Sequence, residues 1–166
     1  AAPITQDQYV SRIDHTFSQR DSLYGSYIYN VQADDTTPTF GFDTRGNRAR
    51  GQNVSLTEVH VFSPTVVNEV RGGFHRFYET EYFGTTDNPE LDIANIIGIP
   101  GVAKRPRDFG PPTFTAGYVL PAVRGIGPRD RMNQLWQISD NISFRKGAHN
   151  MRAGAMVARR NWTFDE

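Results

Sequence analysis

The sequence contains no cysteine, and its four histidines are scattered at positions 15, 60, 75 and 149. Without cysteine the chain has neither a disulfide framework nor a cysteine-based metal site. His15, His60, His75 and His149 show no short ligand spacing such as His-x-x-x-His, so we interpret them as structural. We therefore expect no metal and no cofactor.

Long hydrophobic runs and an excess of one charge are also missing. No stretch approaches the roughly 18 consecutive apolar residues that a membrane helix needs. The 18 basic and 18 acidic residues give a net charge of zero, so we expect no nucleic-acid partner, and the charge gives no reason to expect an acidic membrane surface. Aromatic residues are plentiful, with eleven Phe and seven Tyr. A soluble all-β protein and a membrane β-barrel, whose polar lumen and loops dilute its apolar band, both fit this composition.

Motifs of catalysis and cofactor binding are absent as well. There is no Gly-x-Ser-x-Gly elbow, and Gly125-Ile126-Gly127 lacks the third glycine of a dinucleotide fingerprint. The acidic residues Asp34, Asp35 and Asp92 are not part of a calcium-binding loop pattern. We expect no enzyme. The chain opens AAPITQ, without Met and without a basic-then-apolar leader, so we interpret it as a fragment or a processed piece.

The most informative stretch is 53–78, where two runs rich in Val, Thr and Phe flank the short break Ser63-Pro64-Thr65. Strict alternation in the second run predicts a strand with two different faces. One face is mostly uncharged, whereas the other carries two charges and a histidine. The uncharged set is Val66, Asn68, Val70, Gly72 and Phe74, and the other is Val67, Glu69, Arg71, Gly73 and His75.

Alternation and turn signals predict six strands, at about 9–17, 23–31, 53–62, 66–78, 134–144 and 150–162. Long loops are expected at 32–50 and 79–131. The second should hold a short helix from Pro89 to Ile97, with Asn88 as its cap and Gly98 as its stop.

Two of the predicted strands have a carboxylate among apolar residues. In the strand 53–62, Val54 and Leu56 alternate in phase with Glu58, so we expect Thr57, Val59 and Val61 to face outward instead. A charge at the middle of a lipid-facing strand costs roughly 2–4 kcal/mol for Arg or Lys and less for Glu. In the strand 134–144, Asp140 interrupts the face of Trp136, Ile138, Ile142 and Phe144, which a bulge or a position near the membrane interface would accommodate.

The connections between the expected strands alternate between short and long. Each short turn follows a phenylalanine, at Phe17, Phe62 and Phe144. Tight turns at one end, long loops at the other and aromatic residues at the band edges are typical of outer-membrane barrels. The fold class expected is therefore all-β, with antiparallel up-and-down strands of a transmembrane β-barrel, short periplasmic turns and long extracellular loops.

Three stretches resemble the barrel of TonB-dependent outer-membrane receptors, specifically the Oar-like group. They are QYVSRIDHTFSQRDSLYGSYIY, EVHVFSPTVVNEVRGGFHRF and NQLWQISDNISFRKGAHNMRAGAMVARR, with LDIANIIGIPGV resembling a loop of that group. The resemblance covers nearly the whole chain, 1–166, and implies the barrel wall and outer loops of a bacterial outer-membrane transporter. Such barrels have about 22 strands around a plug. The resemblance gives six of these strands, and neither the plug nor the TonB-contact segment.

The resemblance implies outer-membrane lipid, the rest of the barrel, its plug and an unidentified solute as partners. The TonB energy-coupling complex would be reached only through the parts that the resemblance does not cover. The candidate lumen-facing groups are Arg12, Asp14, Glu69, Arg71 and Arg152, which would hydrogen-bond a plug or a passing solute, or simply one another. A basic patch at Lys104, Arg105 and Arg107 would contact lipopolysaccharide or an anionic substrate, or only water.

The competing hypothesis is a soluble secreted β-sandwich that binds carbohydrate through Tyr and Trp. A barrel piece should fractionate with the outer membrane and need detergent. Expressed alone, a six-strand piece should aggregate, since an unclosed sheet leaves two open edges and is not tolerated in hydrocarbon. Size-exclusion chromatography in buffer without detergent checks this, and a stable water-soluble monomer would contradict the barrel hypothesis.

Overall fold

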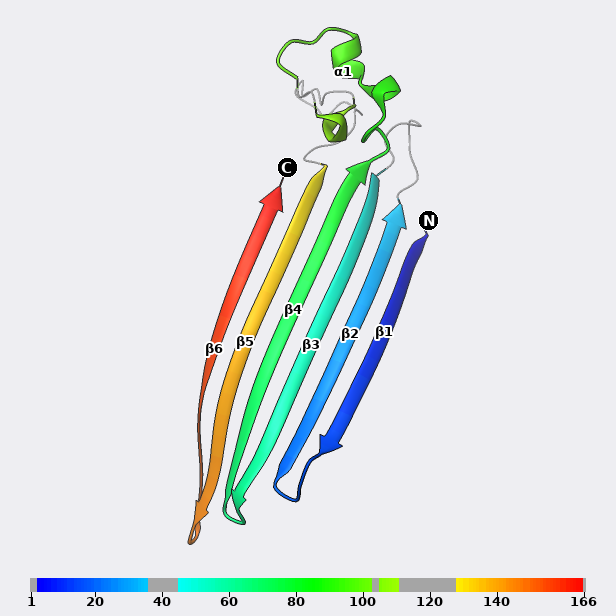
Figure 1. Ribbon diagram of the computed structural model, residues 1–166. Coiled ribbons are helices and arrows are strands. Elements are labelled where there is room, and N and C mark those ends of the chain that lie inside the picture. Colours follow the sequence, from blue (N-terminus) through cyan, green and yellow to red (C-terminus); the bar gives the residue numbers. More distant parts are fainter. Residues whose placement is uncertain (1–2, 36–44, 103–104, 111–127, 166) are drawn as a thin grey trace.

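The computed structural model describes residues 3–35, 45–102, 105–110 and 128–165. Its six strands form one antiparallel sheet in the order of the chain, β1-β2-β3-β4-β5-β6 (Figure 1). Their bounds are β1 Ile4–Thr16, β2 Asp21–Asp35, β3 Arg45–Ser63, β4 Val66–Phe83, β5 Arg129–Lys146 and β6 His149–Asp165. The number, order and direction of the strands confirm the sequence prediction.

The strands are longer than predicted. They hold between 13 and 19 residues, against about five or six in ordinary soluble sheets and about 9–11 for crossing a membrane. The predicted loops 32–50 and 79–131 are correspondingly too long, because β2 continues to Asp35 and β5 begins at Arg129. These strand ends are polar and resemble loops in composition. Opposite charges on neighbouring strands stabilise them instead, as where Glu79 faces Arg131.

The three tight turns lie together at one end of the sheet, and the two long connections lie at the other (Figure 1). In the β5–β6 turn Gly147 has a φ of 60°, a conformation that suits the twist of a two-residue hairpin. The alternation of short and long connections predicted from the sequence is confirmed.

The sheet is a single layer along most of its length. Among the described residues only Phe83 and Ala94 are buried hydrophobic side chains. Large apolar groups remain uncovered, with Trp136 52%, Ile138 56% and Val157 70% exposed. A soluble sandwich would bury such a face against a second sheet. The β-sandwich hypothesis is therefore wrong for the fold of this chain.

A short helical segment follows β4 and lies over the loop end of the sheet (Figure 1). It contains η1 Pro89–Leu91, α1 Ile93–Ile96 and η2 Pro106–Asp108. The predicted helix is present but is divided at Asp92, and Asn88 caps its start by accepting a hydrogen bond from the Glu90 amide. Gly98, with a φ of 74°, follows its end as predicted. Within the described part of the chain, no helix has both the length and the apolar character needed to span a membrane.

The ladder register defines two faces of the sheet, since residues paired across strands project to the same side. We call one the apolar face; its central row runs Ile13, Gly25, Leu56, Gly72, Ile138 and Val157. The other is the polar face, with the rows Arg12, Ser26, Ser55, Gly73, Gln137, Ala158 and Asp14, Tyr24, Thr57, Arg71, Ser139, Met156.

One face assignment made from the sequence is wrong. Thr57 pairs with Arg71 and Val59 pairs with Glu69, so both lie on the polar face, whereas Leu56 and Glu58 lie on the apolar face. The sequence argument treated Glu58 as an isolated charge in the middle of an apolar band. In the structure Glu58 lies toward the turn end, next to other polar groups.

Candidate functional site

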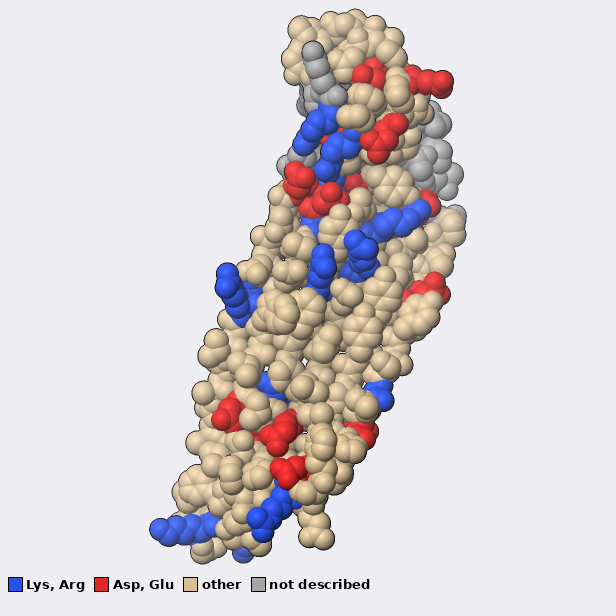
Figure 2. All heavy atoms as spheres, viewed as in Figure 1, with Lys and Arg blue, Asp and Glu red and all other residues tan. Residues whose placement is uncertain are grey.

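The apolar face has an aromatic and aliphatic centre with polar groups at both ends. Phe74 and Trp136 pair across β4 and β5 with their ring centroids 4.2 Å apart, and Tyr9 stacks on Tyr29 at 6.3 Å. In Figure 2, basic side chains gather over the loop-end part of the strands, side chains of both charges lie toward the turns, and a largely uncharged zone separates the two groups. A band of this kind between two polar borders fits hydrocarbon flanked by two headgroup layers.

Asp140, the charge that interrupts the apolar residues of β5, is hydrogen-bonded in place. The Asn68 side-chain amide donates to Asp140 Oδ1 at 2.5 Å and to the Asn141 carbonyl at 3.1 Å. The β4–β5 register continues without a shift past Asp140, so the bulge offered as one explanation is absent. The Asp140 carboxylate lies instead among the polar groups at the turn-end border of the apolar face.

The same border contains a cluster that sequence spacing did not reveal. One ligand atom from each of Asp21, Glu58 and His60 lies within 4.8 Å of the others. His60 Nδ1 is 2.5 Å from Asp21 Oδ1, and the Ser18 hydroxyl donates to the other oxygen of Asp21 at 2.5 Å. The cluster forms because Asp21 faces His60 across the β2–β3 ladder, a relation that appears only once the register is known.

All five residues predicted to face the lumen lie on the polar face, in two separate groups. Arg12 forms a local ion pair with Asp14 at 2.9 Å. Glu69 lies between Arg71, at 3.0 Å, and Arg152, at 3.7 Å. The charged side chains therefore partly neutralise one another. Glu69, Arg71 and Arg152 together hold two positive charges and one negative charge, so this cluster keeps a net charge of +1.

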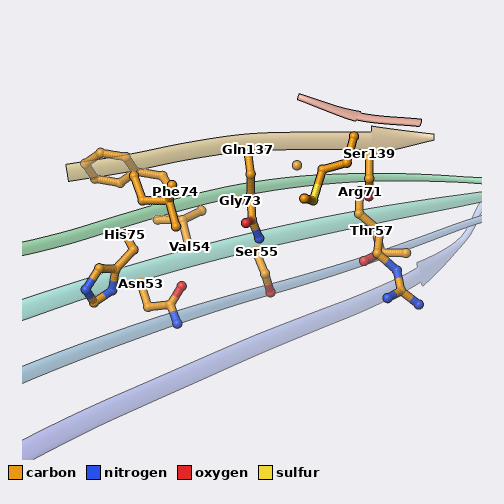
Figure 3. Close-up of a pocket in the computed structure, with 13 residues that line it drawn as sticks. Asn53, Val54, Ser55, Thr57, Arg71, Gly73, Phe74, His75, Gln137 and Ser139 are labelled. Atoms are coloured by element: carbon orange, nitrogen blue, oxygen red, sulfur yellow. The ribbon is translucent and has the colours of Figure 1, made fainter. Parts of the chain in front are cut away.

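A groove of about 410 Å³ opens beside Arg71, between β3, β4 and β5 (Figure 3). Gly73 is among its lining residues, and a Cβ at this position would come within 2.9 Å of the Gln137 side chain. Its polar lining offers amides, hydroxyls, an imidazole and one guanidinium, which suits hydrogen bonding to a hydroxylated or anionic molecule. These polar residues are Asn53, Ser55, Thr57, Arg71, His75, Gln137 and Ser139.

The sequence analysis singled out only Arg71 among these polar groove residues as a candidate. Asn53, Gln137 and Ser139 are ordinary strand residues when read along the chain. They come together only through the register, in which Arg71 faces both Thr57 and Ser139. Cross-strand pairing to a candidate charge is the signal that could have found them.

At the loop end the polar face holds a buried ion-pair network. Glu81 is only 5% exposed and contacts Arg45, Arg129 at 2.5 Å and Arg131 at 3.9 Å. Glu79 accepts a hydrogen bond from the Asn47 amide at 2.9 Å and pairs with Arg131 at 3.2 Å. The network joins β3, β4 and β5 where the long connection leaves the sheet.

The basic patch expected in the long loop is largely paired. Arg105 binds Asp108 at 2.5 Å, and this hydrogen bond raises the pKa of Arg105. Arg107 reaches the strand ends, at 3.2 Å from Asp165 and 3.6 Å from Asp130, and donates to the Pro128 carbonyl. Lys104 lies outside the described residues, and a role of the patch in ligand capture stays a prediction.

Replacing Glu81 by Gln tests the buried network. The substitution leaves Arg45 and Arg129 without the carboxylate that both contact, so the free energy of unfolding should fall by about 3 kcal/mol. Tryptophan fluorescence during guanidinium unfolding of the complete protein in detergent measures this. Glu90→Gln, in the exposed part of the loop, is the matched control and should change stability little. Equal losses in the two variants would contradict a structural role for the network.

The comparison with protein families agrees with this geometry. A family described as "Outer membrane beta barrel domain" matches residues 1–166. A comparison with curated proteins found no match. The family places the chain in the bacterial outer membrane, with membrane lipid around it. With its six antiparallel up-and-down strands, this chain belongs to the outer membrane beta barrel domain family.

Proposed function

We propose that the chain forms part of the barrel wall and outer loops of a TonB-dependent outer-membrane transporter of the Oar-like group, which takes up a solute. The observation that carries the proposal is the contrast between the two faces of one continuous sheet. Leu56 and Ile138 are exposed on one face, while Thr57 and Ser139 line a polar groove on the other. Lipid outside and an aqueous lumen inside account for both faces at once.

The open edges support a larger barrel. In this sheet β1 and β6 each pair on one side only, and β1 is not hydrogen-bonded to β6. Open edges do not occur in hydrocarbon, because their backbone groups would lack partners. Further strands, or a second copy of such a sheet, are therefore needed in the membrane, which agrees with the large barrels of the transporter group.

The polar face is the natural place for contacts with a plug or a solute. Arg12, Asp14, Glu69, Arg71 and Arg152 would line the lumen, in keeping with their shared face. Arg71 is the most informative of them, since it contributes both to the ion-pair group and to the groove. Its guanidinium can bind a carboxylate of the plug or an anionic group of a solute.

The motifs quoted from the sequence favour the TonB-dependent group over other barrels. In the structure RIDH lies on β1, with Arg12 and Asp14 paired on the polar face. FSPT forms the β3–β4 turn, where the Thr65 amide donates to the Ser63 hydroxyl at 3.3 Å. These residues therefore have structural roles in the wall.

A pull-down with the periplasmic domain of TonB tests the proposal. The complete protein, purified from outer membranes in detergent, should be captured by immobilised TonB domain, because energy coupling requires a direct contact. Deleting the periplasmic segment expected before the barrel should abolish the capture while the barrel still resists unfolding by detergent. Absence of capture by the folded, complete protein would overturn the transporter proposal and leave only barrel membership.

A further inference from the structure

Arginines collect at the loop-end border of the apolar face. Arg48 and Arg50 lie on β3 and Arg76 on β4, and the register places all three on the face that carries Leu56 and Phe74. In Figure 2 basic side chains form a group above the uncharged zone, on the side of the long connections. Charged side chains are unfavourable on a strand face that contacts only lipid tails, so these arginines indicate a more polar environment at this level of the sheet.

The three arginines differ in their partners. Arg48 is neutralised by Asp35 at 3.0 Å. Among the described residues, neither Arg50 nor Arg76 has an ion-pair partner; the polar contact of Arg76 is with the sulfur of Met132 at 3.5 Å. Two guanidinium groups are thus available on neighbouring strands.

Aromatic and amide groups hold this pair at the membrane border. The Arg50 guanidinium lies 4.9 Å from the centre of the Tyr78 ring, which orients it. Gln52 faces Arg76 across the ladder and donates to the Tyr27 hydroxyl at 3.2 Å. Because Arg50 faces Tyr78, Arg76 is its diagonal neighbour, and such neighbours lie about 7–8 Å apart. Two arginine side chains at this separation can both contact one tetrahedral anion.

The opposite border, at the turn end, carries charges of both signs. Asp21, Glu58 and Asp140 lie on the same face near the turns, where the register also places His15, His60, His149 and Lys146. Carboxylates do not attract phosphate, whereas the guanidinium groups of Arg50 and Arg76 at the loop-end border do.

We propose that Arg50 and Arg76 form a binding site for the phosphate of a lipid headgroup, with Tyr78 and Gln52 at its margin. Guanidinium groups bind phosphate through paired N–H donors and remain charged at any physiological pH. The acyl chains of the same lipid would lie along the apolar face toward Phe74 and Trp136, which a free phosphate ion could not use. The inference rests on the assignment of the apolar face to lipid and does not depend on TonB coupling.

Native mass spectrometry of the complete protein with diphosphoryl lipid A tests the site. The double variant Arg50→Gln/Arg76→Gln should bind lipid A at least about tenfold more weakly, because two charge-assisted contacts are lost. Arg76→Gln alone should show part of this loss. Arg160→Gln is the matched control, since Arg160 lies one ladder step from the level of Arg76 but on the polar face, opposite Leu135.

Each other outcome overturns the inference in a recognisable way. Weaker binding by Arg160→Gln, with the double variant unaffected, would show that the two faces are reversed. Displacement of lipid A by inorganic phosphate at an equal phosphate concentration would show a site for the free ion instead. Unchanged lipid binding in all folded variants would exclude the site, and the TonB capture experiment would be unaffected by that result.

Discussion

The continuous backbone ladder is the constraint on which the rest of the structure depends. In hydrocarbon every N–H and C=O group must be bonded within the protein, and an antiparallel sheet achieves this between neighbouring strands. The register runs from β1 to β6 with one irregularity, between Val61 and Ser63 beside a turn. A slip of one residue would exchange the faces of a whole strand, so the register determines which side chains meet lipid.

The two faces then acquire their properties from the same alternation. On the polar face Glu69 of β4 pairs with Arg71 of the same strand and with Arg152 of β6, two strands away. At the loop end the buried Glu81 joins β3, β4 and β5, and Arg107 ties the long connection to Asp130 and Asp165. On the apolar face most charges occur toward the borders, where headgroups and water can solvate them, and Arg159, which faces Trp136, lies nearest the centre. The structure thus combines a lipid-facing surface, a polar wall with a groove, and an anchored loop.

Local patterns predicted much of the fold, and the errors lie where non-local pairing decides. Alternation gave six strands, and Gly, Pro and polar residues gave the three turns, although β3 continues past Phe62 to Ser63 and β5 past Phe144 to Lys146. The strand ends were missed because residues such as Glu79 become strand-like only when Arg131 lies opposite. The face of Leu56 and the cluster of Asp21, Glu58 and His60 depend on the β2–β3 and β3–β4 registers, which no single segment encodes. The groove around Arg71 escaped notice for the same reason.

Neighbouring residues of β5 allow the most direct test of the central claim that opposite faces meet different solvents. This sequence contains no cysteine, so Ile138→Cys and Ser139→Cys each introduce a single thiol within it. With the complete protein reconstituted in lipid vesicles, a charged, membrane-impermeant maleimide should label Ser139→Cys and leave Ile138→Cys unmodified. An apolar maleimide, which partitions into lipid, should label Ile138→Cys and so show that its thiol lies in the bilayer. Labelling of Ile138→Cys by the charged reagent, with Ser139→Cys protected, would contradict the account.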